Sequence, residues 1–199
     1  CSDGIAEVRD VTLEDVTDPP TEVVLELQPK PDNPRNSEGS FVRLKDGTLL
    51  FAWSRFRQTG AKWDNGEADI ACRRSADGGR TWSGTDEILV RNTAMNVMSA
   101  SFLRLQDGRL ALFYLEKRSA RIHGVKMRVS TDEAKTWGEA VDVTGTMPEG
   151  QYVLNNDRVI QLKGGRILVP LAYHPPKPPD GGFSPAARLL CVRSVYGGR

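Results

Sequence analysis

The chain of 199 residues contains 27 Lys and Arg against 26 Asp and Glu, which gives a formal net charge of +1. This near balance does not indicate binding to nucleic acid or to an anionic membrane surface. No run of about eighteen apolar residues is present, so we expect no transmembrane helix. The 19 glycines and 12 prolines are typical of many short strands joined by turns, and no helical periodicity competes with this pattern.

Residues 1–20 are polar and show no clear periodicity, so we interpret them as an extended N-terminal arm. Cys1 would suit the lipid-modified first residue of a processed bacterial lipoprotein, which predicts a secreted, periplasmic or lipid-anchored protein. The alternative is that the sequence simply begins at this residue. Residues 21–27 are rich in β-formers and predict a strand, which Pro29 and Pro31 would end.

A hairpin pattern then occurs three times. In each copy two apolar runs flank a turn that contains a glycine, namely Gly47, Gly108 and Gly165. Asp-Gly and Gly-Gly turns between apolar runs are strong hairpin signals. The predicted strand pairs are 41–44 with 49–53, 102–105 with 110–114, and 159–162 with 167–171.

Each hairpin is followed by a variable loop and a third β-rich run, and the first two copies continue into a fourth. Cys72 and Cys191 hold the same place in two of the third strands, which predicts buried thiols too far apart to form a disulfide. Four antiparallel strands per unit of about sixty residues are typical of a propeller blade, so the sequence predicts an all-β propeller. The third strands are predicted at 68–74, 124–129 and 188–193, and the fourth strands at 86–90 and 139–143.

A turn with the pattern Ser-x-Asp-x-Gly-x-Thr-Trp follows the third strands. It is complete at 75–82, has Ala134 in place of the glycine at 130–137, and begins again at 194–199 with Tyr196 in place of the aspartate. This turn resembles the Asp box, or BNR repeat, of the sialidase (neuraminidase) superfamily. Three further runs resemble bacterial exo-α-sialidase-like proteins of that superfamily, namely 96–101, 110–115 and 155–162.

The resemblance covers about residues 21–199 and implies a six-bladed β-propeller built from four-stranded antiparallel blades. Six blades at this pitch need roughly 350 residues, so the chain would cover about three of them. We therefore expect the chain to be part of a longer protein; the alternative is a homodimer in which two half-rings close. In such a propeller the Asp boxes lie at the periphery and have a structural role.

The same resemblance implies functional residues at the mouth of the ring. Asp64 lies eleven residues before Ser75, in the place of the family's acid/base. Arg35 lies near the place of the first carboxylate-binding arginine, although the family's Ile-Pro does not follow it. A guanidinium group matches the geometry of a carboxylate. The substrate-binding candidates, at the blade entrances and beside Asp64, are Arg35, Glu38, Arg55, Trp63, Asn156, Asp157 and Arg158. The alternatives are an ordinary turn at Asp64 and solvent-exposed loop residues at the other positions.

The implied activity is that of a sialidase-like glycoside hydrolase that removes a terminal acidic sugar, with a glycan or sialoside as its partner and no cofactor. In this family a tyrosine nucleophile, its glutamate and two further arginines come from the second half of the propeller, and none of the four tyrosines here matches that motif. His123 and His174 are the only histidines, and no spacing of Cys, His and Asp indicates a metal site. The alternative function is a non-catalytic Asp-box propeller that binds glycan or protein.

Overall fold

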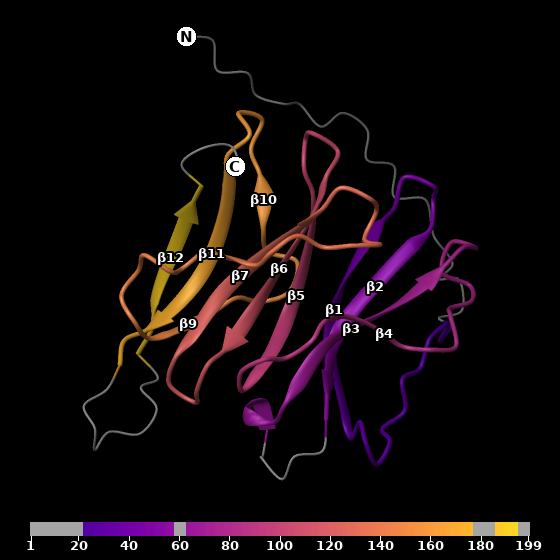
Figure 1. The fold of residues 1–199 in the computed structure, drawn as a ribbon, viewed down its shortest axis with the longest axis horizontal. Helices are drawn as coiled ribbons and strands as arrows, with labels where there is room; N and C mark the ends of the chain where they lie inside the picture. Colours follow the sequence, from indigo (N-terminus) through magenta and orange to yellow (C-terminus); the bar gives the residue numbers. More distant parts are fainter. Residues whose placement is uncertain (1–21, 58–62, 177–185, 195–199) are drawn as a thin grey trace, which may run out of the picture.

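The structure, a computed structural model, describes residues 22–57, 63–176 and 186–194 (Figure 1). The predicted N-terminal arm with Cys1, and residues 195–199 of the third Asp box, lie outside these ranges. The described chain is all-β, with one four-stranded antiparallel sheet and one curled eight-stranded sheet. Within the described ranges, no helix has the length and apolar character needed to cross a membrane.

The first sheet is an antiparallel meander in the order β1-β2-β3-β4. The turn between its first two strands contains Gly47 with a φ of 89°, a conformation that is open to glycine and strained for other residues. The hairpin and the third and fourth strands predicted for this unit are confirmed. The strands are β1 (Arg35–Arg43), β2 (Leu49–Phe56), β3 (Ala68–Ser75) and β4 (Glu87–Val90).

The second sheet contains two further meanders, which merge because β9 pairs with β11 and also meets β7 through His123 and Gln151. Its hydrogen-bonded order is β10-β11-β9-β7-β6-β5, with β8 on β7 and β12 on β11. One meander comprises β5 (Asn96–Arg104), β6 (Leu110–Lys117), β7 (His123–Ser130) and β8 (Val141–Asp142). The other comprises β9 (Gln151–Val153), β10 (Ile160–Gln161), β11 (Ile167–His174) and β12 (Arg188–Arg193).

Two predictions about strands are wrong, one about whether a strand is present and one about where two strands begin. Residues 22–29 form no strand, and the side chains of Val23 and Val24 are exposed, so a strand here would bury no continuous apolar face. β1 and β5 begin at Arg35 and Asn96, well before their predicted starts. They extend this far because their pairing with β2 and β6 continues across a local bulge. The residues before each predicted hairpin are therefore strand residues in the first two meanders.

The two third-strand cysteines differ in their environment. Cys72 is fully buried, as predicted, and burial raises the pKa of its thiol to about 12. Cys191 is exposed, contrary to the prediction. Its neighbours on β12, Leu190 and Val192, pack against a hydrophobic core, so the side chain of Cys191 points to the opposite, exposed face. Equivalent places in the repeats therefore differ in burial, because burial depends on what packs beside each unit.

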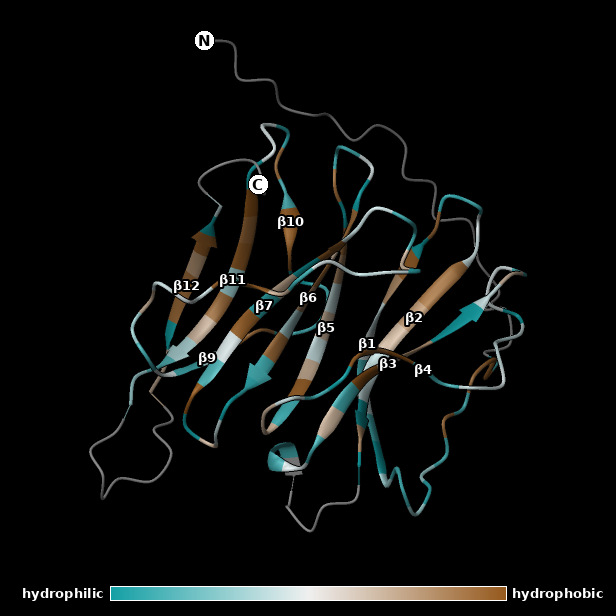
Figure 2. Ribbon diagram, in the orientation of Figure 1, coloured by the Kyte–Doolittle hydropathy of each residue, from teal (hydrophilic) through white to brown (hydrophobic). Residues whose placement is uncertain are grey.

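β6 lies between the two halves of the hydrophobic core, and its continuous apolar run reflects this position (Figure 2). Leu110 and Leu112 pack in a core that includes residues of the first sheet. Phe113 and Leu115 belong to a second core, with residues of β9 and β11, because successive side chains of a strand point to opposite faces. A strand that is buried on both faces is expected of a blade stacked between two others.

Each of the first two Asp boxes is a self-contained turn. In the first, the Asp77 carboxylate accepts hydrogen bonds from the Thr81 hydroxyl at 2.6 Å, the Thr81 amide at 2.9 Å and the Ser75 hydroxyl at 2.8 Å. Asp132 makes the same contacts in the second box, where the hydroxyl and amide of Thr136 lower its pKa to about 2. These bonds satisfy the turn locally, in keeping with a structural role.

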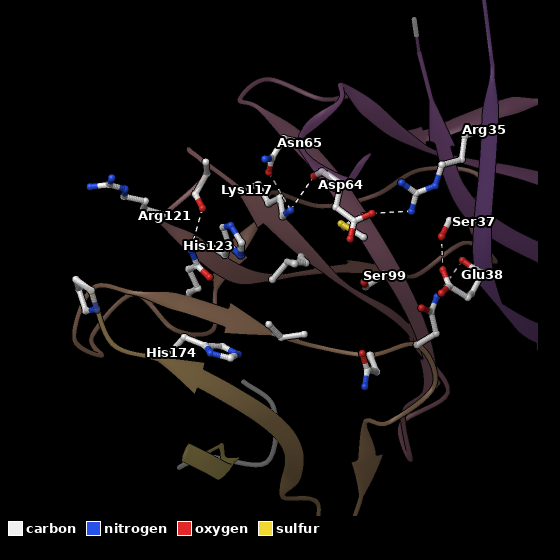
Figure 3. A pocket seen from close by; sticks show the side chains of 18 of the residues that line it. Arg35, Ser37, Glu38, Asp64, Asn65, Ser99, Lys117, Arg121, His123 and His174 are labelled. Atoms are coloured by element: carbon white, nitrogen blue, oxygen red, sulfur yellow. Dashed lines mark hydrogen bonds and ion pairs between the residues drawn. The ribbon is translucent and has the colours of Figure 1, made fainter. Parts of the chain in front are cut away.

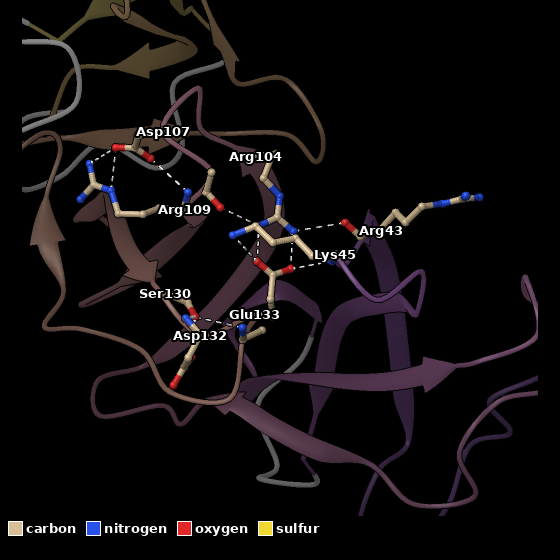
Figure 4. A network of polar contacts seen from close by, with 10 residues as sticks. Arg43, Lys45, Arg104, Asp107, Arg109, Ser130, Asp132 and Glu133 are labelled. Carbon is tan, nitrogen blue, oxygen red and sulfur yellow. Dashed lines mark hydrogen bonds and ion pairs between the residues drawn. The ribbon is translucent and has the colours of Figure 1, made fainter.

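A cluster of charged side chains joins the second Asp box to the first sheet (Figure 4). The Glu133 carboxylate accepts hydrogen bonds from both terminal nitrogens of Arg104, each at 2.7 Å, and from the Lys45 amide at 2.9 Å. The hydrogen bonds from Arg104 are the main cause of a Glu133 pKa lowered to about 2. Arg104 also donates to the Arg43 carbonyl at 3.2 Å, so the cluster fixes the second sheet against the β1–β2 turn.

Candidate functional site

A pocket of about 560 Å³, which we call the central pocket, opens where the first strands of the three meanders meet (Figure 3). Its walls come from β1, β5, β6, β9 and the ends of β7 and β11, together with the short 3-10 helix η1 (Trp63–Asn65). Charged and polar side chains predominate in its lining, with a smaller apolar part. A concave site with convergent polar groups at the centre of a rigid fold is a candidate binding site.

Each first strand is interrupted at the level of the central pocket. In β1 the pairing shifts between Asn36 and Gly39, and in β5 it shifts between Met98 and Ser101. In the third meander β9 and β10 both pair with β11, and the six residues between them, 154–159, leave the ladder. Bulges re-aim side chains out of the alternating pattern of a strand and are common beside functional sites.

Strained backbone accompanies two of these interruptions. Ser99 in the β5 bulge has a φ of 59°, and Asp157 between β9 and β10 has a φ of 52°. Both are non-glycine residues in the left-handed region, which is sparsely populated and persists only where the surroundings hold it. The Ser99 amide donates to the hydroxyl of Ser54, which is buried, at 3.1 Å. The protein thus maintains an unfavourable local conformation in the pocket wall.

Side chains of the third meander tie the three interrupted strands together. The Asn156 amide nitrogen donates to the Glu38 carbonyl at 3.2 Å and to the Ala100 carbonyl at 3.0 Å. The Asp157 carboxylate accepts a 2.5 Å hydrogen bond from the Ser40 hydroxyl, which also accepts one from the Phe102 amide. These contacts satisfy backbone groups that the bulges remove from the ladder. They fix the three strands relative to one another at the base of the pocket.

Asp64 is held in the pocket wall through its backbone. Its carbonyl accepts a hydrogen bond from the Lys117 ammonium at 2.7 Å and one from the Asn96 side-chain amide at 2.6 Å. The Asn96 amide also donates to the Gly66 carbonyl at 2.9 Å, so it spans both ends of the turn that follows η1. Two buried side chains of the second sheet therefore position a loop of the first sheet.

The Asp64 side chain faces the pocket and pairs with Arg35. One carboxylate oxygen lies 2.6 Å from a terminal nitrogen of Arg35, and the two side chains are 53% and 37% exposed. The Arg35 guanidinium also lies 4.1 Å from the centre of the Phe56 ring, a cation–π contact that fixes its plane. Residues 29 positions apart thus form one polar unit that solvent, or a ligand, can reach.

A row of cross-strand partners crosses the second sheet beside Asp64. Strand register pairs Asn96 with Lys117, Lys117 with His123, His123 with Gln151, and Gln151 with His174. Directly opposed residues in neighbouring strands point to the same face. We call these five residues the polar row, and all but Asn96 line the central pocket. The row is continuous only because β9 joins the two meanders.

Two members of the polar row are buried to an unusual degree for their chemistry. Lys117 and His123 are each 7% exposed. Neither ring nitrogen of His123 has a hydrogen-bond partner among the described residues. Burial lowers the pKa of His123 to about 4, with the charge of Lys117 adding to the effect and the nearby Ala120 and Ser119 backbone opposing it. His123 is therefore a neutral imidazole at pH 7.

The central pocket brings together four of the eight residues predicted from the sequence, namely Arg35, Glu38, Asp64 and Asn156. Arg55 instead pairs with Asp32 and Asp86 and does not line the pocket. Asp157 binds Ser40 and does not line the pocket, and Arg158 is exposed and also lies outside the lining. The side chain of Trp63 lies outside the described part of the structure.

Sequence reasoning missed Lys117, Arg121, His123, Gln151 and His174, all of which line the pocket. Lys117 follows Glu116 at the end of the apolar run of β6, where a charged residue is expected in solvent. Its burial could be foreseen only from the register that sets it opposite His123. Among the described residues no tyrosine lines the pocket, and no three His, Cys, Asp or Glu side chains are grouped as metal ligands would be.

No protein-family model matches the chain, and no curated protein matches it. Solved structures match its fold. A protein of unknown function from Dyadobacter fermentans aligns with a TM-score of 0.66 at 19% identity, over 85% of this chain and 54% of its own. An endo-arabinase from Bacteroides thetaiotaomicron aligns with a TM-score of 0.60 at 8% identity, over 87% of this chain and 62% of its own.

A leech intramolecular trans-sialidase also aligns, with a TM-score of 0.58 at 13% identity, over 76% of this chain and 42% of its own. The chain thus spans about half the length of the structures it matches. At such identities the likeness shows the fold alone, an all-β arrangement of antiparallel meanders that this chain shares with these structures. Because these neighbours include an arabinase and a trans-sialidase, the shared fold does not select a substrate.

Proposed function

We propose that this chain forms part of a six-bladed propeller glycoside hydrolase that removes a terminal acidic sugar from glycans. The observation that supports this function most directly is the placement of Asp64. Its carboxylate faces the central pocket while its carbonyl is held by Lys117 and Asn96, so the loop is anchored and the acid remains accessible. An acid/base residue needs this combination of fixed position and contact with the substrate.

In this proposal Asp64 exchanges a proton with the oxygen of the glycosidic bond. Glycoside hydrolysis ordinarily uses such a group together with a nucleophile or base on the other side of the sugar. Glu38 is the other carboxylate residue in the described pocket lining, and we assign it to binding the sugar hydroxyls. The nucleophile implied by the family resemblance would come from a part of the propeller beyond the blades present here.

Arg35 is the candidate from the sequence for binding the carboxylate of the sugar. Its guanidinium is already paired with Asp64 at 2.6 Å, so it binds a second carboxylate only by sharing or exchanging partners. Such an exchange would release the Asp64 side chain toward the scissile bond. Binding of an acidic sugar and activation of Asp64 would then be linked.

Hydrolysis of fluorogenic aryl glycosides tests this function. The protein and its Asp64→Asn variant are assayed on 4-methylumbelliferyl N-acetyl-α-neuraminide, β-glucuronide and α-L-arabinofuranoside. We expect turnover of an acidic glycoside and a fall in kcat/KM of about 10²- to 10⁴-fold in the variant, since this is the range for loss of a general acid/base. Asp46→Asn is the matched control, because Asp46 lies in the exposed β1–β2 turn, outside the central pocket, where it accepts a hydrogen bond from the Thr48 amide.

Wild-type turnover in the Asp64→Asn variant would remove Asp64 from the mechanism. A second function is a non-catalytic glycan-binding propeller, because the convergent polar side chains of the central pocket suit binding of a sugar without its hydrolysis. In that case none of the three glycosides is hydrolysed, whereas the corresponding free sugars still bind. Saturation-transfer NMR with N-acetylneuraminate and glucuronate distinguishes the two functions.

A further inference from the structure

The polar row contains a positive charge that forms no direct ion pair with a carboxylate among the described residues. Lys117 is 7% exposed, and its ammonium donates to the Asp64 carbonyl at 2.7 Å and to the Asn65 side-chain oxygen at 3.5 Å. Among the described residues it forms no ion pair. Burial lowers the pKa of Lys117, and the charge of Asp64, which is itself paired with Arg35, opposes this effect only in part. A buried ammonium without a directly bound counter-charge is unfavourable, so an anion that reaches it gains a strong interaction.

His123, the direct cross-strand partner of Lys117, has unused hydrogen-bonding capacity. The residue is 7% exposed, it lines the central pocket, and neither of its ring nitrogens has a hydrogen-bond partner in the described structure (Figure 3). A neutral imidazole offers one donor and one acceptor, the combination that a sugar hydroxyl can satisfy. Leaving both nitrogens unpaired in a buried site is costly, which points to a ligand that supplies the missing partners.

Arg35 and Lys117 both bind Asp64, but only Arg35 binds its carboxylate. The charge of Arg35 is balanced by the Asp64 carboxylate at 2.6 Å, and its plane is stacked on Phe56. Lys117 binds only uncharged oxygens, those of Asp64 and Asn65. An incoming carboxylate therefore gains more at Lys117, where no existing ion pair has to be broken.

We propose that Lys117 and His123 form a carboxylate subsite of the central pocket, in which Lys117 binds the carboxylate of an acidic sugar and His123 binds a neighbouring hydroxyl. This inference rests on the proposed function, and it moves the main carboxylate contact from Arg35 to the polar row. Met98, Leu115 and Val153 line the pocket two residues along from Asn96, Lys117 and Gln151, so the subsite borders an apolar surface. Sugars present an apolar face and polar edges, which suit such a surface.

Binding of matched charged and neutral sugars tests the subsite without requiring turnover. The probes are N-acetylneuraminate and its methyl ester, and glucuronate and its methyl ester, measured by isothermal calorimetry at pH 7. We expect at least one acid to bind about 10-fold or more tightly than its ester, and Lys117→Met to abolish this preference, since hydrogen bonds to charged groups are the stronger class. Lys117→Arg should retain part of the preference. Lys163→Met, in the exposed β10–β11 turn, is the matched control and should change nothing.

His123→Leu should weaken the acid and its ester alike, by about 3- to 10-fold, because it removes the hydroxyl contact and leaves the charge. The subsite is refuted if acid and ester bind equally well to the wild type, or if Lys117→Met keeps the preference. Circular dichroism verifies that each variant is folded. If Lys117→Met is unfolded, the subsite is tested instead by comparing the acid–ester preference of the wild type with that of Lys117→Arg. If the wild type hydrolyses an acidic glycoside but Lys117→Met keeps the preference for the acid over its ester, the subsite alone is refuted. A Lys117-dependent preference without any hydrolysis would refute only the hydrolase.

Discussion

The neutral, buried state of His123 predicts a specific loss of stability in acid. An unfolded histidine has a pKa of about 6.5, whereas burial lowers the pKa of His123 to about 4 in the folded protein. Between these values the unfolded chain binds a proton that the folded protein excludes, so the free energy of unfolding falls as the pH falls from about 6.5 to about 4. Below about 4 both states are protonated and this contribution no longer changes.

The size of the effect follows from the shift. A shift of about 2.5 pKa units corresponds to about 3.4 kcal/mol at 1.36 kcal/mol per unit, and the access of solvent to the open pocket reduces this to about 2 kcal/mol. The charge of Lys117 disfavours the proton, and His174 acts weakly in the same direction. His123→Gln, which does not titrate, should lack this component of the pH dependence.

Urea unfolding followed by tryptophan fluorescence at pH 7.0, 6.0, 5.0 and 4.0 measures the prediction. Carboxylates with lowered pKa values, such as Glu133, also reduce the stability in acid, but they do so in both proteins. The informative quantity is therefore the difference between wild type and His123→Gln, which should change by about 2 kcal/mol in favour of the variant on going from pH 7.0 to 4.0. A difference that is independent of pH, or an NMR titration of His123 with a midpoint near 6.5, would refute this account of the ring.

Two further substitutions test the contacts that hold the meanders together. Asn156→Ala leaves the Glu38 and Ala100 carbonyls without the shared donor, and we expect a loss of about 2 kcal/mol in urea unfolding, at about 1 kcal/mol per hydrogen bond. The neighbouring Asn155→Ala is the control, and equal midpoints for the two variants would contradict the cross-link. Glu133→Gln removes the negative charge that binds Arg104, and we expect the free energy of unfolding to fall by about 1 kcal/mol at pH 7. Because the Glu133 pKa is lowered from 4.5 to about 2, this loss should vanish between those pH values, and its persistence at pH 2 would contradict the ion-pair origin.

The local features of this protein are determined by short stretches of sequence. The glycines Gly47, Gly108 and Gly165 adopt φ values of 83° to 89°, so each hairpin turn is specified by residues within the turn itself. Asp77 and Asp132 satisfy their boxes through partners no more than four positions away. The strand pattern and the repeat could therefore be predicted without knowledge of the tertiary structure.

The candidate site was accessible from the sequence only in part. The family resemblance placed Asp64 and Arg35 near one another in function, and the structure brings their side chains to 2.6 Å. The resemblance did not indicate that Asp157 would bind Ser40, a contact between residues 117 positions apart. The bulges that create such contacts depend on how distant strands are aligned, and no short-range pattern encodes that alignment.

Lys117 and His123 show the same division most clearly. Both residue types are ordinary at the end of a strand in a sequence, and their meaning changes once β6, β7 and β9 are in register. Packing of three meanders around one pocket removes the solvent that would otherwise stabilise the ammonium and pair the imidazole. Short-range patterns in the sequence were enough to predict most of the strands and turns. The tertiary structure decided which polar groups are buried without partners, because desolvation is a property of the assembled sheets and not of any one segment.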